Sequence, residues 1–265
     1  MSAMLKLTIG CLLGLFLAAP ALARDAESVL IVSIDALHPD ALDEQTAPTL
    51  RAMMRPGHYT LAGRSVDPPK TLIAHTTMFT GLAPTDSGKL DNEWQPGTPR
   101  VTKATWFDDA KQRGFSTAFY YAKTKLGYLV SGAVDEHGLE RDAGIDKARA
   151  FFRQGGRRFA VLHVSGLEDA GTESGWLSPE YREELTYIDK ALGPLFEDVG
   201  RRGAHVIVVT SDHAGHGRLH GTQHPDDFKV PLIVSSNLSH TPPVPQGRWS
   251  ITGLRSMVRE FLGLM

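Results

Sequence analysis

The stretch "SVLIVSIDALHPDAL", from Ser28 to Leu42, opens with a nearly continuous apolar run of seven residues that ends at Asp35. A short apolar run of this kind is typical of a strand that is buried on both faces of a parallel sheet. "FAVLHV" (159–164) and "HVIVVTS" (205–211) have the same character, and weaker candidates are "STAFYYA" (116–122) and "VPLIVSS" (230–236). The sequence therefore predicts five strands.

Segments with helical patterns alternate with these strands. They are "ATWFDDAKQRG" (104–114), "AGIDKARAFFRQGG" (143–156) and "SPEYREELTYIDKALGPLFEDVGRRG" (178–203). Gly114 suits the end of the first helix, and Ser178 and Pro179 suit the cap and first residue of the last. Pro194 is expected to kink or split that helix. The alternation predicts an α/β fold with a mainly parallel central sheet and helices on both faces.

The N-terminal stretch "MSAMLKLTIGCLLGLFLAAPALARD" has the order of a secretory signal. Lys6 precedes an apolar run, and Ala21-Leu22-Ala23 precedes the first charged residues. The run is short for a membrane anchor, which needs about 20 apolar residues. We expect a signal peptide over residues 1–23, a single catalytic domain over residues 24–265, and a secreted or periplasmic protein.

Composition excludes several classes of function. The chain carries 28 basic and 30 acidic residues, a net charge of −2, so it has no basic field for nucleic acid. Its one cysteine, Cys11, falls within the expected signal, so residues 24–265 hold neither a disulfide nor a thiol nucleophile. We expect no stable membrane span after the signal is removed.

Acidic residues and histidines follow three of the predicted strands. Asp35 ends the first strand, Asp212 and His213 follow "HVIVVTS", and Glu168 comes soon after "FAVLHV". In parallel sheets the carboxyl ends of the strands meet at one edge, where ligands bind. Each aspartate taken alone is more often a helix N-cap, but their convergence favours a metal site.

Five motifs, taken in order, resemble the alkaline phosphatase superfamily, and most closely its nucleotide pyrophosphatase/phosphodiesterase branch. They are "VLIVSIDALHPDAL", "PPKTLIAHTTMFTG", "GKLDN", "SPEYREELTYIDKALG" and "VTSDHAGHGRLHGTQHPDD". The resemblance implies an alkaline-phosphatase-like fold.

Only "YYAKTKLGYLVSGAVDEHGLE" (120–140) is a candidate insertion before Glu168, so we expect a small or absent cap over the active site. Lys123 and Lys125 within it face either an anionic substrate or, as exposed lysines usually do, solvent.

The resemblance implies a nucleophile and a hydrogen-bond donor. The threonine nucleophile of the family matches Thr71, at the start of a predicted helix where negative charge is favoured. The asparagine that donates to a phosphoryl oxygen matches Asn92. On their own, Thr71 reads as an N-cap and Asn92 as a turn residue.

The resemblance also implies two divalent metal ions, most naturally Zn²⁺. The first ion would be held by Asp35, Thr71, Asp212 and His213. The second would be held by Glu168 and His220. His216 and His224 are not expected ligands, although His224 would take the place of His220 if the loop register were shifted.

One departure weakens the second metal position. The family pattern places a histidine four residues after its acidic ligand, and here that residue is Thr172, a neutral hydroxyl. Glu173, His163 or water are the candidate substitutes. Loss of the imidazole predicts that phosphorylation of Thr71 is less affected than hydrolysis of the intermediate.

These features predict a metal-dependent hydrolase of phosphodiesters or nucleotide pyrophosphates that acts through a phosphothreonine on a small-molecule phosphoester. The alternatives are a metal-binding member that has lost catalysis, and a phosphomonoesterase or phosphonate hydrolase of the same superfamily. A sulfatase is not expected, because the C/S-x-P-x-R string is absent from the sequence.

Overall fold

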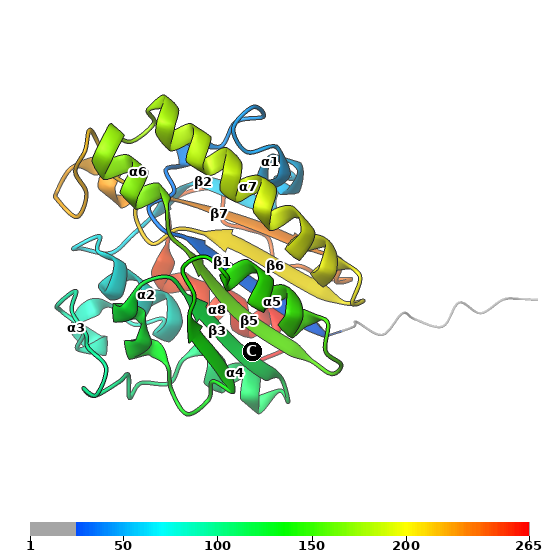
Figure 1. The fold of residues 1–265 in the computed structure, drawn as a ribbon. Helices are drawn as coiled ribbons and strands as arrows, with labels where there is room; N and C mark the ends of the chain where they lie inside the picture. Colours follow the sequence, from blue (N-terminus) through cyan, green and yellow to red (C-terminus); the bar gives the residue numbers. More distant parts are fainter. Residues whose placement is uncertain (1–24, 265) are drawn as a thin grey trace, which may run out of the picture.

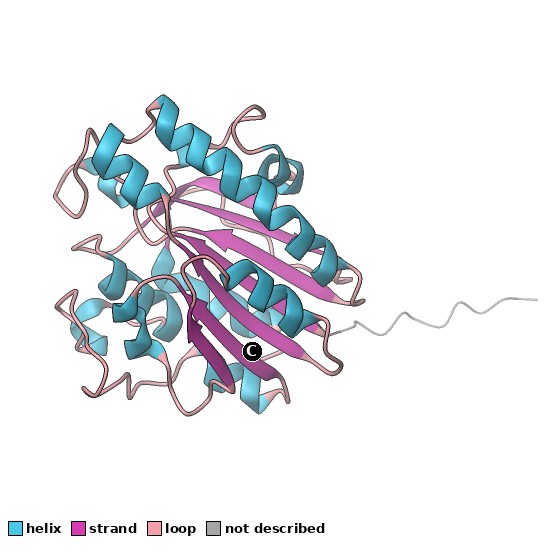
Figure 2. Ribbon diagram, in the orientation of Figure 1, coloured by secondary structure: helices cyan, strands magenta, loops and turns pink. Residues whose placement is uncertain are grey.

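An eight-stranded sheet forms the centre of the molecule (Figures 1 and 2). The computed structural model describes residues 25–264, so the expected signal peptide lies outside the described residues. The strands, in chain order, are β1 (Ser28–Ile34), β2 (Tyr59–Arg64), β3 (Ser116–Tyr121), β4 (Glu136–Leu139), β5 (Arg158–Val164), β6 (His205–Thr210), β7 (Lys229–Ser236) and β8 (Trp249–Ser250). All five strands predicted from the sequence are present.

The sheet is mainly parallel, as predicted. Its strand order is β4-β3-β5-β1-β6-β7-β2-β8. β1 lies between β5 and β6 and is parallel to both, and β3 continues the parallel set. β7 is antiparallel to both of its neighbours, β6 and β2. The central order β5-β1-β6 brings together the three strands that are followed by acidic residues or histidines.

Helices cover both faces of the sheet (Figure 1). They are α1 (Pro48–Met53), α2 (Thr71–Thr80), α3 (Pro84–Ser87), α4 (Trp106–Gln112), α5 (Gly144–Phe152), α6 (Leu167–Ser174), α7 (Pro179–Gly200) and α8 (Leu254–Phe261). Along β1, Val29 and Ile31 pack in one apolar core with α2, α4 and α8. Leu30 and Val32 pack in the other, with α1, α5 and α7. This period-two alternation buries the strand on both faces.

α7 is one continuous helix of 22 residues, so the expected split at Pro194 does not occur. The Ser178 side chain accepts a hydrogen bond from the Tyr181 N–H, and Pro179 is the first helical residue, as predicted. Gly193, which precedes Pro194, has no Cβ to clash with the proline ring, which makes this position tolerable within a helix.

The candidate insertion over residues 120–140 forms no separate cap within the described chain. It contains the end of β3, the 3-10 helix η2 (Thr124–Leu129) and the edge strand β4. Among residues 25–264, no helix combines the length and apolarity needed to cross a bilayer.

Candidate active site

Three buried side chains meet where β1 and β6 end. Asp35 directly follows β1, and Asp212 and His213 follow β6. His213 Nε2 lies 3.6 Å from Asp35 Oδ1 and 3.5 Å from Asp212 Oδ2. The exposed fraction of each of the three residues is 0%. Three of the four expected ligands of the first metal position thus lie together at the carboxyl ends of β1 and β6.

Most ligand atoms of these side chains lack hydrogen-bond partners. Within the described chain, Asp35 Oδ1, Asp212 Oδ2 and His213 Nε2 are buried without one, and Asp35 Oδ2 faces only the Lys123 ammonium and the His163 ring. The other oxygen of Asp212 accepts from the Ala36 N–H at 3.2 Å, and His213 Nδ1 donates to the Ala214 carbonyl at 2.9 Å. Nε2 of His213 therefore faces the two carboxylates, and a metal ion bound there would take its lone pair in place of a proton. Buried polar atoms are rarely left unpaired, so the set fits a divalent metal ion.

The pKa values reflect the crowding of charge. Burial and the neighbouring Asp35 carboxylate raise the pKa of Asp212 to about 6. Burial opposes the charged form of His213, but Asp212, Glu168 and Asp35 outweigh it and raise its pKa to about 9. A cation bound among these groups would relieve the repulsion between the carboxylates.

Thr71 is the first residue of α2 and is 2% exposed. The N-cap is Lys70, and no side chain caps the helix there, so the alternative role of Thr71 as an N-cap is wrong. His75 Nδ1 donates to the Thr71 carbonyl at 2.7 Å, and its Nε2 accepts from Ser33 Oγ at 2.9 Å. Burial lowers the pKa of His75 well below its usual value, so a neutral imidazole supports the helix start.

Asn92 lies against the same helix N-terminus. Its Oδ1 accepts a hydrogen bond of 2.8 Å from the Leu72 N–H. That bond fixes the amide by its oxygen and leaves Nδ2 available to donate, the role that the resemblance implies. The side chain is half-buried, so a ligand above α2 can reach it.

The second metal position contains fewer ligands. His220 Nε2 lies 3.7 Å from Glu168 Oε1, and the His213 and His220 rings stack with centroids 4.7 Å apart. Thr172 is exposed, and its hydroxyl donates to the Glu168 and Asp169 carbonyls of its own helix. It therefore does not replace the missing histidine.

His163 does not replace it either. Its Nδ1 accepts a hydrogen bond of 3.3 Å from the Ala122 N–H, so its Nε2 carries the proton. That Nε2 lies 3.4 Å from Asp35 Oδ2. His163 therefore faces Asp35 as a proton-bearing group.

Lys123, which was expected to face either an anionic substrate or solvent, contacts the predicted metal ligands instead. Its side chain is only 20% exposed, and Nζ forms an ion pair with Asp35, another of 2.6 Å with Glu168 Oε2, and a hydrogen bond of 3.3 Å with Thr71 Oγ. Burial opposes its charge, but the two carboxylates raise the pKa of Lys123. The residues next to it in the sequence, Ala122 and Thr124, do not indicate that this lysine is buried rather than exposed.

His216 and His224 lie apart from the Asp35 site. Their rings stack with centroids 3.8 Å apart. His216 Nδ1 donates to Asp227 Oδ1 at 2.7 Å, and Asp227 Oδ2 accepts from the Thr222 N–H and hydroxyl. Because the Asp227 carboxylate is fully paired, this group stabilises the loop after β6.

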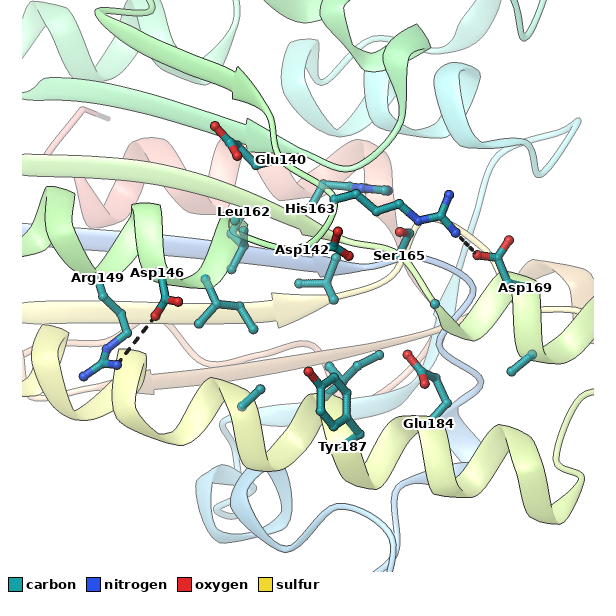
Figure 3. A pocket seen from close by; sticks show the side chains of 18 of the residues that line it. Glu140, Asp142, Asp146, Arg149, Leu162, His163, Ser165, Asp169, Glu184 and Tyr187 are labelled. Carbon is teal, nitrogen blue, oxygen red and sulfur yellow. Dashed lines mark hydrogen bonds and ion pairs between the residues drawn. The ribbon is translucent and has the colours of Figure 1, made fainter.

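A cavity of about 510 Å³ opens beside the site, between α5, α6, α7 and the end of β5 (Figure 3). Its lining includes six carboxylates and two guanidinium groups: Glu140, Asp142, Asp146, Asp169, Glu173, Glu184, Arg141 and Arg149. Figure 3 shows the pair Arg149–Asp146, and Arg141 pairs with Asp169 at 2.5 Å. Excess negative charge makes this cavity unsuitable for a phosphate group.

Comparison with curated proteins identifies relatives of the chain. A profile of the type I phosphodiesterase / nucleotide pyrophosphatase family matches residues 29–228. Human ectonucleotide pyrophosphatase/phosphodiesterase family member 7 is 25% identical over 246 residues, which cover 79% of this chain and 53% of that protein. GPI ethanolamine phosphate transferase 1 of Neurospora crassa is 36% identical over 77 residues, 28% of this chain and 8% of that protein. The chain spans about half or less of the length of these relatives.

Solved structures share the fold at low sequence identity. The C-terminal periplasmic domain of EcEptC from Escherichia coli has a TM-score of 0.67 and 13% identity, covering 91% of this chain and 83% of that one. A protein of the alkaline phosphatase superfamily from Vibrio parahaemolyticus has a TM-score of 0.62 and 15% identity, covering 93% and 71%. These structures show that the chain shares the fold of a protein of the alkaline phosphatase superfamily, and the profile match shows that the chain belongs to the type I phosphodiesterase / nucleotide pyrophosphatase family.

Proposed function

We propose that this protein is a secreted or periplasmic metal-dependent hydrolase of phosphodiesters or nucleotide pyrophosphates, with Thr71 as its nucleophile. The observation that carries the proposal is the group of unpaired ligand atoms on Asp35, Asp212 and His213 beside Thr71. Family membership supports phosphoester chemistry. The signal-like segment before Ala23 supports export.

The first metal position would be formed by Asp35, Asp212, His213 and the Thr71 oxygen. A divalent ion there supplies Lewis acidity, which lowers the pKa of a bound hydroxyl and offsets charge on phosphoryl oxygens. The N-terminus of α2 adds the positive end of a helix dipole beneath Thr71.

In the proposed reaction, Thr71 Oγ loses its proton and attacks phosphorus. The new Oγ–P bond forms as the bond from phosphorus to the leaving oxygen breaks, and the leaving oxygen takes up a proton. Asn92 Nδ2 donates to a non-bridging oxygen in this step. Water then attacks the phosphothreonine, the Oγ–P bond breaks, and Thr71 regains a proton as the water loses one.

The test compares hydrolysis of bis-p-nitrophenyl phosphate and p-nitrophenyl phosphate by wild type, Thr71→Ala and Thr77→Ala. Thr77 lies on the same helix, about 9 Å further along its axis by the rise per residue. We expect a preference for the diester, loss of activity in Thr71→Ala and retention in Thr77→Ala. Activity that survives Thr71→Ala would refute the nucleophile, and a preference for the monoester would favour a phosphomonoesterase.

The second candidate function is metal binding without turnover. It is favoured by the hydroxyl of Thr172, which bonds to its own helix instead of facing Glu168. Under this alternative, the protein binds zinc but hydrolyses neither ester, and Thr71→Ala changes nothing.

N-terminal sequencing of protein exported by a bacterial host tests the location, with Arg24 as the expected first residue.

A further inference from the structure

We propose that the ammonium group of Lys123 takes the place of the second metal ion, so that the site operates with one divalent ion and one built-in cation. The inference rests on the proposed function, because it assigns the groups that would surround the phosphoryl group. It replaces the expectation of two metal ions. The side chain supplies a charge of one where a second metal ion would supply two.

The position of Nζ is the first argument. Lys123 Nζ lies 2.6 Å from Glu168 Oε2 and is paired with Asp35. It therefore lies between a ligand of the first metal position and the acidic ligand of the second. Zinc binds carboxylate oxygens at about 2.0–2.2 Å, so an ion on the same Glu168 oxygen would have to displace the ammonium, whereas the first ion can take Asp35 Oδ1, which has no hydrogen-bond partner.

The remaining donor atoms are the second argument. Glu168, His213 and His220 offer atoms within 4.8 Å of one another, and so do Asp35, Asp212 and His213. His213 has one free lone pair, on Nε2, because Nδ1 donates to the Ala214 carbonyl. If that lone pair serves the first ion, only Glu168 and His220 remain at the second position, too few for a protein zinc site, which normally has at least three protein ligands.

The contacts of Lys123 assign it a role towards substrate. An ammonium group has three donors in a compact charge. Asp35 and Glu168 accept two of them, and the third faces Thr71 Oγ at 3.3 Å. A phosphoryl group bonded to Thr71 would bring its oxygens within reach of Nζ. Lys123 would thus stabilise both the attacking oxygen and the phosphorylated intermediate.

The exchange of a metal for an ammonium has a kinetic consequence. A bound zinc ion lowers the pKa of its water to about 7, which supplies hydroxide for the second step. An ammonium group donates hydrogen bonds but does not coordinate water in this way. Formation of the phosphothreonine should therefore be fast compared with its hydrolysis, and a burst of leaving group should precede slow turnover.

The test counts zinc ions without substrate, by equilibrium dialysis and elemental analysis of the purified protein. The variants are Lys123→Met, Thr172→His and the two combined, with Lys125→Met as a control lysine from η2. Lys123→Met keeps the aliphatic stem. Thr172→His restores an imidazole on α6 four residues after Glu168, on the same face of the helix. Thermal unfolding verifies that each variant is folded.

We expect one ion per chain in wild type, Lys125→Met and Thr172→His, and two in the combined variant. Two ions of similar affinity in wild type would overturn the proposal, whatever the variants do. Equal zinc content in wild type and a folded combined variant would also overturn it. The zinc count is independent of the activity assay, so an active Thr71→Ala would refute the nucleophile without altering this result.

Discussion

Tyr181 Oη donates a hydrogen bond of 2.7 Å to the carbonyl oxygen of Ala36. The same hydroxyl accepts from the His38 N–H at 2.8 Å, so both sides of the turn after β1 are tied to α7. Ala36 has φ +62°, a left-handed conformation that costs an L-residue about 1–2 kcal/mol. The two bonds therefore hold a strained turn that orients Asp35.

We expect Tyr181→Phe to weaken this turn. The change leaves the buried His38 N–H unpaired and leaves the Ala36 carbonyl with only its 3.3 Å bond from Trp176 Nε1, and it should lower the free energy of unfolding by about 1–3 kcal/mol. Zinc affinity should fall about 10- to 100-fold, as for other groups that orient metal ligands. Denaturant unfolding and zinc titration measure the two effects. Tyr187→Phe, 70% exposed on the same helix, is the matched control and should change neither.

The fold could be predicted because its central strands have a strong apolar signal. β1 is buried at all seven positions, and its sequence has almost no other interpretation. β2, β4 and β8 were missed. β2 has an irregular burial pattern, β4 is a short and mostly exposed edge strand, and β8 has two residues. Their pairing depends on the tertiary structure, which local periodicity does not encode.

The site could be predicted in part for a related reason. Asp35, Asp212 and His213 follow strong strands, so strand order alone brings them to one edge of the sheet. Lys123 follows β3, which is separated from β1 by β5, and the long reach of its side chain decides the contact with Asp35. Side-chain reach across a sheet edge has no signature in sequence.

Gly215→Ala should disturb the packing beside His220. An added Cβ would lie 2.4 Å from Trp176 Cε2 and 2.7 Å from the Leu219 carbonyl oxygen. Trp176 packs beside the His220 ring, with centroids 5.7 Å apart. Overpacking of this kind costs about 1–3 kcal/mol of unfolding free energy.

Gly155→Ala is the control for that substitution. Nothing lies within 4 Å of its added Cβ and its φ lies outside the left-handed region, so it should change the free energy of unfolding little or raise it by about 0.4–1 kcal/mol. Thermal or denaturant unfolding separates the two variants. Equal stability of Gly215→Ala and wild type would show that Trp176 moves freely.

Asp198 should contribute stability that depends on pH. Its side chain, 7% exposed, pairs with Arg149 at 2.9 Å, Arg153 at 3.1 Å and Arg201 at 3.0 Å. Burial alone would raise the pKa of Asp198, but hydrogen bonds and charge from the arginines lower it below 3.8. Because the folded-state pKa is depressed, the stabilisation is present above 3.8 and is lost as the pH falls through the folded-state value.

Asp198→Asn should therefore lower the free energy of unfolding at pH 7 by about 1–3 kcal/mol, and the difference from wild type should shrink below pH 3.8. Denaturant unfolding over a series of pH values measures it. Asp146→Asn is the control, since its side chain is 83% exposed and lies 3.8 Å from Arg149. A difference that persists unchanged at low pH would contradict the assignment.

His213→Gln should abolish the response of the protein to zinc. His213 Nε2 is the nitrogen that faces Asp35 and Asp212. Loss of a direct ligand should weaken zinc binding about 100-fold or more, which is a larger effect than the loss of a group that only orients a ligand. Zinc that binds the folded state raises the unfolding temperature of wild type in proportion to the logarithm of its concentration. The variant should unfold at the same temperature with and without zinc.

His224→Gln is the control, since its side chain is 44% exposed on the loop after β6, and it should keep the wild-type response to zinc. Equal stabilisation of His213→Gln and wild type would place the zinc ion elsewhere and remove the basis for the proposed nucleophile.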